Sequence, residues 1–255
     1  MYAIFKRDFL QYFRSPVGYV AIAIFSFLSG FIFYSQYVGG AVSISSEVIS
    51  LRSFFVVIVP IITMASFAED KKRGTEVLYY TTPIDLFSVV AGKFLAAIAL
   101  LGVMFINVII HMIVTISNGG MVDIGAWGSV IVFFFMAAMF VSVGLLSSSL
   151  NDSQIVSAIV TFVMILIFQM LSTISTYAKS ALNAVVYNLT QDNELAATAG
   201  DNIANIINWL DPFARTSDFR SGVFSVSALL FCLSVAVVFL YITYRVLEKK
   251  RWSQG

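Results

Sequence analysis

Long apolar intervals bounded by charged or turn-forming residues occupy most of the chain. A helix needs about 20 mostly apolar residues to cross the hydrocarbon core of a bilayer, and six intervals come close to that length. They predict an all-α integral membrane protein with six transmembrane helices. The predicted spans are Val17–Val38, Val48–Ala68, Phe94–Ile116, Trp127–Leu150, Ile155–Thr173 and Val223–Tyr244.

The second predicted span has the shortest charge-free stretch. Only 16 residues separate Arg52 from Glu69, so we expect the long side chain of Arg52 to reach toward the outer membrane interface. Pro60 lies inside this span and predicts a kink there.

Three segments remain outside the spans. Residues 1–16 place apolar and charged side chains at helical spacing and end at Ser15-Pro16, which is typical of an amphipathic helix on a membrane surface. Residues 69–92 form a polar loop. Residues 174–221 carry apolar residues at helical spacing and predict short outer helices between the fifth and sixth spans. We interpret residues 1–255 as a single transmembrane domain.

Composition agrees with lipid as the solvent of the chain. Hydrophobic residues make up 59% and charged residues 11%, whereas soluble domains are about half apolar and about a quarter charged. The formal net charge is only +1, so the sequence offers no basic surface for a nucleic-acid partner.

The placement of lysine and arginine predicts the orientation. Eleven of them fall on the side of the two termini and four on the other, and cytoplasmic loops carry the excess of positive charge. Both termini are therefore expected in the cytoplasm. The eleven are Lys6, Arg7, Arg14, Lys71, Lys72, Arg73, Lys93, Arg245, Lys249, Lys250 and Arg251; the four are Arg52, Lys179, Arg215 and Arg220.

Motifs for catalysis and for nucleotide binding are missing from the sequence. There is no phosphate-binding glycine loop and no zinc-protease or hydrolase motif. One cysteine, Cys232, and one histidine, His111, are too few for a zinc site. An intramembrane protease would need His111 beside a serine of the cluster 147–149, but these are expected at opposite sides of the membrane. We expect neither a catalytic residue nor a bound cofactor or metal.

Three of the polar residues within the predicted spans are candidates for a functional role. Asn107 and His111 are four residues apart and share one helical face, and Gln169 lies in the fifth span. Such groups face the bundle or a cavity. They predict either a substrate path or hydrogen bonds that hold the helices together.

Residues 67–94 read FAEDKKRGTEVLYYTTPIDLFSVVAGKF. This stretch resembles the cytoplasmic loop of type-2 ABC exporter permeases, especially the branch that includes gliding-motility-associated permeases. Residues 5–19 are similar to the connecting helix and first span of that family. Residues 210–223 are similar to its outer segment before the last span. Tyr79-Tyr80-Thr81 departs from the leucine-rich sequence that is more usual there.

The resemblance implies the partners. ABC ATPase subunits would bind ATP and magnesium on a separate chain, and a second permease subunit, identical or homologous, would complete the path in the lipid bilayer. The loop would place a short helix, Lys72–Tyr80, in a groove of the ATPase, with Thr75 capping it. The residues expected to contact the ATPase are Lys72, Arg73, Gly74, Thr75, Glu76, Leu78 and Tyr79.

The expected function is therefore that of the permease subunit of an ATP-driven exporter in the plasma membrane of a bacterium. An alternative is a non-transporting anchor or signalling subunit with the same architecture. An ion-coupled carrier is disfavoured, because His111 is the only ionisable residue expected near the middle of the bilayer.

Overall fold

A computed structural model describes residues 1–40, 42–77, 79, 85–217, 219 and 224–254, with side chains up to Trp252. These residues are almost entirely helical, without a β-strand among them. The helices are α1 Tyr2–Arg14, α2 Pro16–Val38, α3 Ile44–Ser53, α4 Phe55–Thr63, α5 Ala68–Lys72, α7 Leu86–Ser117, α8 Ile124–Leu150, α9 Gln154–Thr190, α10 Asn193–Leu210, α11 Pro212–Arg215 and α12 Val226–Gln254.

Aspartate side chains start four of these helices. Asp85 accepts hydrogen bonds from the backbone amides of Phe87 and Ser88 at 3.1 and 3.2 Å. Asp123, Asp192 and Asp211 cap α8, α10 and α11 in the same way. A carboxylate at this position satisfies amides that have no partner inside the helix.

Five helices are long and apolar enough to cross a membrane, namely α2, α7, α8, α9 and α12. Each contains or closely matches one predicted span. The remaining prediction, Val48–Ala68, corresponds to a bent pair of helices, α3 and the helical stretch Phe55–Lys72, which meet at 60°. The chain therefore has five candidate spans, or six if this pair crosses as one.

The 60° bend in the second span lies at Phe54, six residues before Pro60, which lies inside α4. A kink at Pro60 itself stays a prediction. The amides of Val57 and Ile58 both bond to the Phe54 carbonyl, at 3.0 Å each. The Ser53 carbonyl thereby loses its helical partner and instead accepts a hydrogen bond from the Gln169 side chain at 2.7 Å. A side chain from α9 thus stabilises the break.

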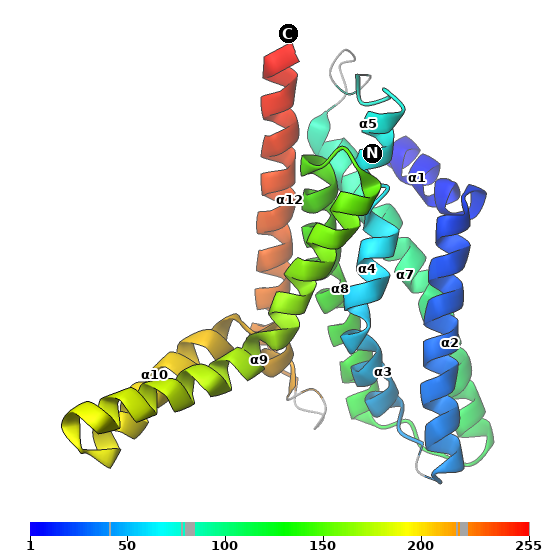
Figure 1. Cartoon of the computed structure of the whole chain (residues 1–255). Helices are drawn as coiled ribbons and strands as arrows, with labels where there is room; N and C mark the ends of the chain where they lie inside the picture. Colours follow the sequence, from blue (N-terminus) through cyan, green and yellow to red (C-terminus); the bar gives the residue numbers. More distant parts are fainter. Residues whose placement is uncertain (41, 78, 80–84, 218, 220–223, 255) are drawn as a thin grey trace.

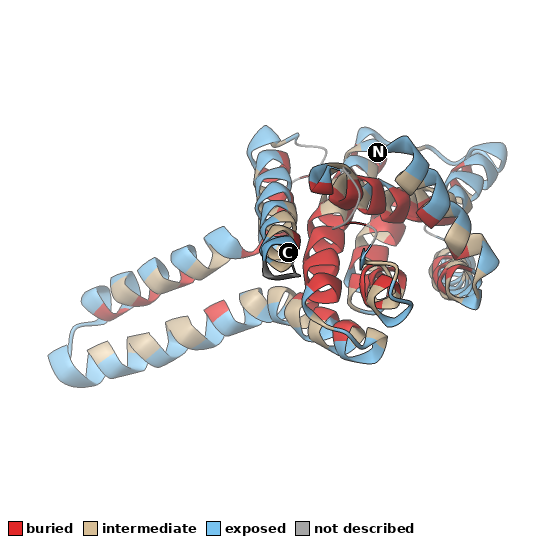
Figure 2. Cartoon of the chain, turned by 90° about the horizontal axis from the view of Figure 1, so that it is seen from above, coloured by how far each residue is buried: buried red, intermediate tan, exposed pale blue. Residues whose placement is uncertain are grey.

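Helix α8 is the centre of the bundle, with 18 of its 27 residues buried. Figure 2 shows the buried residues gathered in the middle of the bundle. Helix α8 packs against α3, α4, α7, α9 and α12. Both chain termini lie toward the same end of the bundle (Figure 1).

The outer segment differs from the prediction of several short helices. Helix α9 continues without interruption past Thr173 to Thr190, because no glycine or proline breaks it. It then pairs with α10, and this hairpin extends sideways from the bundle (Figure 1). At the other end of the chain, α1 packs against α2 and α7; its location on a membrane surface stays a prediction.

Candidate functional site

The loop between the second and third predicted spans folds back on Asp70. Helix α5 ends at Lys72, and Gly74 adopts a positive φ of 69°, a conformation that glycine takes without steric cost. The Thr75 hydroxyl then donates to the Asp70 carbonyl at 3.2 Å and to its Oδ1 at 3.1 Å. Asp70 therefore lies at the root of the loop, where the chain returns toward the bundle.

Lys93 of α7 joins this root to α1. Its Nζ lies 2.6 Å from Asp70 Oδ2 and 3.0 Å from Asp8 Oδ2, and it donates to the Ser66 carbonyl at 2.5 Å. The ammonium also lies 5.0 Å from the centre of the Phe67 ring. Lys93 is 3% exposed, and a buried cation of this kind is stable only with such partners.

Arg7 and Tyr79 complete the charge cluster. Arg7 donates to Asp8 Oδ1 at 2.6 Å and to the Tyr79 hydroxyl at 2.9 Å, and Tyr79 donates to Asp70 Oδ2 at 2.7 Å. Burial raises the pKa of Tyr79, so the phenol stays protonated and can donate. We call Arg7, Asp8, Asp70, Tyr79 and Lys93 the inner charge cluster; its two cations balance its two carboxylates.

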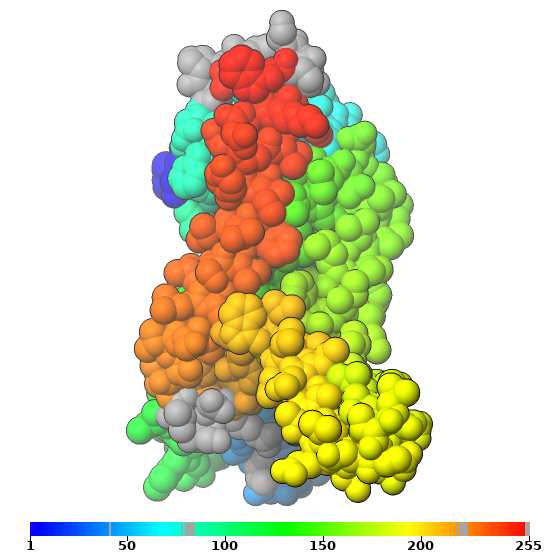
Figure 3. Space-filling view, turned by 90° about the vertical axis from the view of Figure 1, so that its left-hand side faces the viewer, coloured from blue at the N-terminus to red at the C-terminus, as the bar shows by residue number. Residues whose placement is uncertain are grey.

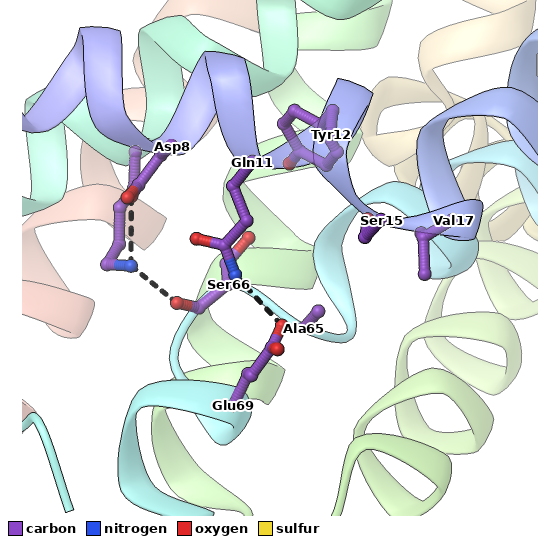
Figure 4. Close-up of a pocket in the computed structure, with 9 residues that line it drawn as sticks. Asp8, Gln11, Tyr12, Ser15, Val17, Ala65, Ser66 and Glu69 are labelled. Carbon is purple, nitrogen blue, oxygen red and sulfur yellow. Dashed lines mark hydrogen bonds and ion pairs between the residues drawn. The ribbon is translucent and has the colours of Figure 1, made fainter. Parts of the chain in front are cut away.

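A small cavity of about 30 Å³ lies beside the cluster, between α1 and residues 65–69. Figure 4 shows Gln11 reaching from α1 to Glu69 across it, a hydrogen bond of 3.0 Å. The cavity has roughly room for a water molecule. Within the described part of the chain, no group of three or more His, Cys, Asp or Glu could hold a metal ion.

A second set of contacts ties α5 to the end of α8. Lys71 Nζ donates to the carbonyls of Ser149 and Asn151 at 2.7 and 3.0 Å and lies 3.2 Å from Asp152 Oδ1. Lys250 of α12 donates to the same Ser149 carbonyl at 3.2 Å. Cations at a helix C-terminus donate hydrogen bonds to its free carbonyls and interact favourably with the negative end of the helix dipole. The loop root is thus linked to α1, α7, α8 and α12.

The predicted short helix Lys72–Tyr80 is confirmed only in its second half, within the described residues. Lys72 is the last residue of α5, Arg73–Glu76 form turns, and Val77 and Tyr79 are helical. The Thr75 hydroxyl bonds back to Asp70. Leu78 and Tyr80 lie outside the described residues.

The predicted ATPase-contact residues divide into an exposed tip and a buried root. Lys72, Arg73 and Gly74 are exposed, and Thr75 and Glu76 are partly exposed. Tyr79 is only 4% exposed, because its hydroxyl belongs to the inner charge cluster. In this structure the Tyr79 ring therefore packs inside the chain. A contact of the seven residues with an ATPase stays a prediction.

The three predicted path residues lie in two places. Asn107 donates to the Ser26 hydroxyl of α2 at 2.7 Å, and His111 Nδ1 lies 2.7 Å from Glu47 Oε1. Gln169 lies apart from them, on the carbonyl of Ser53. Each makes a hydrogen bond to another helix, which is the packing role that the sequence left open beside a substrate path.

The sequence interpretation missed one buried ionisable residue, Glu47, and expected another, Arg52, in a different environment. Glu47 is fully buried and accepts a hydrogen bond from Ser29 at 2.7 Å, in addition to its contact with His111, on which Phe33 stacks at 4.2 Å. Arg52 does not reach the outer interface: it is 5% exposed and donates to Thr216 at 2.9 Å. His111 is therefore not the only ionisable residue inside the bundle. The serine cluster Ser147–Ser149 makes its contacts with Phe67 and with Lys71 of α5, whereas His111 contacts Glu47.

These features define a multi-pass, all-helical membrane protein whose terminus-side loop is fixed to the bundle by buried ion pairs. A family model described as ABC-2 family transporter protein matches residues 2–252. The chain belongs to the ABC-2 transporter family, whose members are membrane-spanning permeases of ABC transporters. No curated protein matches the chain.

Proposed function

We propose that this chain is the transmembrane permease subunit of an ATP-driven exporter, in which a separate ATPase subunit binds ATP and magnesium. The loop sequence at residues 67–94 favours the branch that includes gliding-motility-associated permeases. The proposed complex contains two ATPase subunits and a second permease subunit, identical or homologous. It lies in the plasma membrane of a bacterium, with both termini in the cytoplasm.

One observation carries the proposal: the exposed tip of the loop has a rigid root. Lys72 and Arg73 are exposed and Val77 is 51% exposed, whereas Asp70 is ion-paired to Lys93 and to Arg7, at 2.6 and 3.5 Å. A partner that displaces the tip would therefore displace α1 and α7 with it. A permease without a nucleotide site needs such a mechanical connection.

The first experiment is purification of the chain from its native host in mild detergent. We expect an ATPase with a phosphate-binding glycine loop to co-purify in fixed ratio and to hydrolyse ATP. Purification of the intact, folded chain without a nucleotide-binding partner would contradict the permease assignment. A stable complex whose ATP hydrolysis moves no lipid, glycan or peptide from its host would instead favour the non-transporting anchor.

The second experiment tests the tip with the double variant Lys72→Glu and Val77→Asp. Because both side chains are exposed, the chain should fold normally while its affinity for the ATPase falls at least tenfold, which corresponds to about 1.4 kcal/mol. The matched control is Lys249→Glu with Trp252→Asp on α12, which changes the same types of exposed residue on the same side of the bundle.

The variant Tyr79→Phe distinguishes the role of the loop root from that of its exposed tip. It keeps the buried ring but removes the hydroxyl that bonds Arg7 and Asp70. We expect the ATPase to remain bound. Equal ATPase affinity for wild type, tip variant and control would place the contact elsewhere on the permease.

A further inference from the structure

An apolar groove runs between α7 and α12 on the side of the bundle where the termini lie. Its volume is about 540 Å³, and it is lined by Val90, Ala91 and Leu95 of α7 and by Val237, Leu240 and Tyr241 of α12, among others. Figure 3 shows α12 in front, with the first turns of α7 beside its terminus-side half. This groove is separate from the inner charge cluster and from the predicted loop contacts.

We infer that this groove is a binding site for the acyl chain of a resident anionic phospholipid from the leaflet on the side of the termini. The inference goes beyond the proposed permease function and does not depend on it.

The length of the groove suits a single acyl chain. Its α7 wall extends from Asp85 to Leu95, which is about 15 Å at 1.5 Å per residue. The hydrocarbon core of a bilayer is about 30 Å thick, so this length is about that of an acyl chain from one leaflet.

The charged group and the acceptor of its neighbouring tyrosine lie at the end of the groove nearer the chain termini. Asp85 lies there, but its carboxylate already caps α7 through the amides of Phe87 and Ser88. Tyr244 also lies there, and its hydroxyl donates to Glu248 at 3.3 Å. The walls farther in are apolar except for the Tyr241 hydroxyl, so the groove offers few polar partners to a hydrophilic ligand.

Basic residues of α12 lie just beyond this end of the groove, where the phosphate group of a bound lipid would lie. Beyond Tyr244, α12 carries Arg245, Lys249, Lys250 and Arg251 against a single carboxylate, Glu248. Arg245 is bonded to Glu248 at 2.5 Å, while Lys249 and Arg251 are exposed. Basic residues immediately beside a membrane-spanning helix attract anionic headgroups, and this charge complementarity selects an anionic lipid.

The test uses phosphatidylglycerol with a photoreactive group on its acyl chain, in vesicles that hold the purified full-length protein. We expect saturable labelling of residues 85–95 and 237–244, mapped by mass spectrometry. The groove-filling variant Ala91→Trp should reduce this labelling at least fivefold. Ile113→Trp, an exposed position of α7 outside the groove, is the matched control and should label as wild type.

Further readouts decide the occupant. The same probe with a phosphatidylcholine headgroup should label at least threefold less. Labelling that does not saturate, that is equal for both headgroups, or that persists in folded Ala91→Trp overturns the inference. If that variant fails to fold, competition by unlabelled phosphatidylglycerol in the wild type gives the same decision.

Two outcomes would assign the groove to another occupant. Loss of labelling when ATP is added to the complete complex would make the lipid cargo and not a resident. A disulfide between two chains carrying Ala91→Cys in a Cys232→Ser background would make the occupant a second copy. Either result contradicts the inference.

Discussion

At the scale of single residues, the inner charge cluster is the feature with the largest energetic consequence. Lys93 lies in contact with two carboxylates from different parts of the chain, Asp8 and Asp70. Removing one member of a buried ion pair leaves an uncompensated charge, which is far more costly than the net stabilisation the pair provides. Arg7 shows the same balance: burial alone would lower its pKa, but its bonds to Asp8 and Tyr79 raise that pKa above its ordinary value.

We therefore expect Lys93→Met to lower the apparent stability of the protein by about 3–5 kcal/mol. Adding Asp70→Asn should recover part of this loss, because Arg7 then balances the remaining Asp8. Thermal unfolding in a fixed detergent measures both effects. Lys249→Met, an exposed lysine on α12, is the control and should change stability by no more than about 0.5 kcal/mol; a similar loss in the control would show that Lys93 has no special role.

At the scale of elements, the α9–α10 hairpin depends on small residues. Ala196, Gly200 and Ala204 are buried at four-residue spacing on α10, which lets the two helices approach closely. A Cβ added at Gly200 would lie 1.8 Å from Asn183 Oδ1 and 3.0 Å from the Lys179 carbonyl. Lys179 also forms an ion pair with Asp201. The close approach of α10 to α9 therefore depends on the face of α10 that carries these small residues.

Gly200→Leu should separate α10 from α9 and leave the rest of the bundle intact. The side chain of Asn183 could move, but the Lys179 carbonyl belongs to the backbone of α9, so overpacking should cost about 1–3 kcal/mol. Hydrogen exchange of the amides of α10 should accelerate at least tenfold, with that of α8 unchanged. Ala197→Leu places the same side chain on the exposed face of α10; equal exchange in the two variants would refute the small-residue interface.

At the scale of the whole molecule, contacts at one end of the bundle unite segments that are distant in sequence. Lys71 and Lys250 share the Ser149 carbonyl, and Arg7 and Lys93 share Asp70. These four cations belong to the eleven that the sequence assigned to one side. Cytoplasmic loops carry the excess of positive charge, so we expect this end of the bundle on the cytoplasmic side.

Cysteine labelling in sealed cells tests this orientation. Single cysteines at Ser43, Met121 and Asn193 should react with an impermeant maleimide from outside, and those at Lys72 and Lys249 should react only after the membrane is opened. All five positions are exposed in the structure, whereas the native Cys232 is buried and should stay silent. Labelling of position 72 from outside would reverse the proposed topology.

The sequence by itself determined the elements whose signal is local. Five apolar intervals correspond to five long helices. In lipid a helix satisfies every backbone hydrogen bond within itself, and its apolar side chains suit the hydrocarbon around it. The start of α2 at Pro16 was likewise readable from Ser15-Pro16.

Tertiary structure decided the features that depend on distant partners. The break at Phe54 requires Gln169 from α9, the burial of Tyr79 requires Asp70 and Arg7, and Glu47 is stable inside the bundle only beside His111 and Ser29. Arg52 is similar, since a guanidinium expected at the outer interface is instead held inside the bundle by Thr216. The charge pattern of a sequence shows which residues carry charge, but only the packing of the helices determines which of these charges have partners that make burial possible.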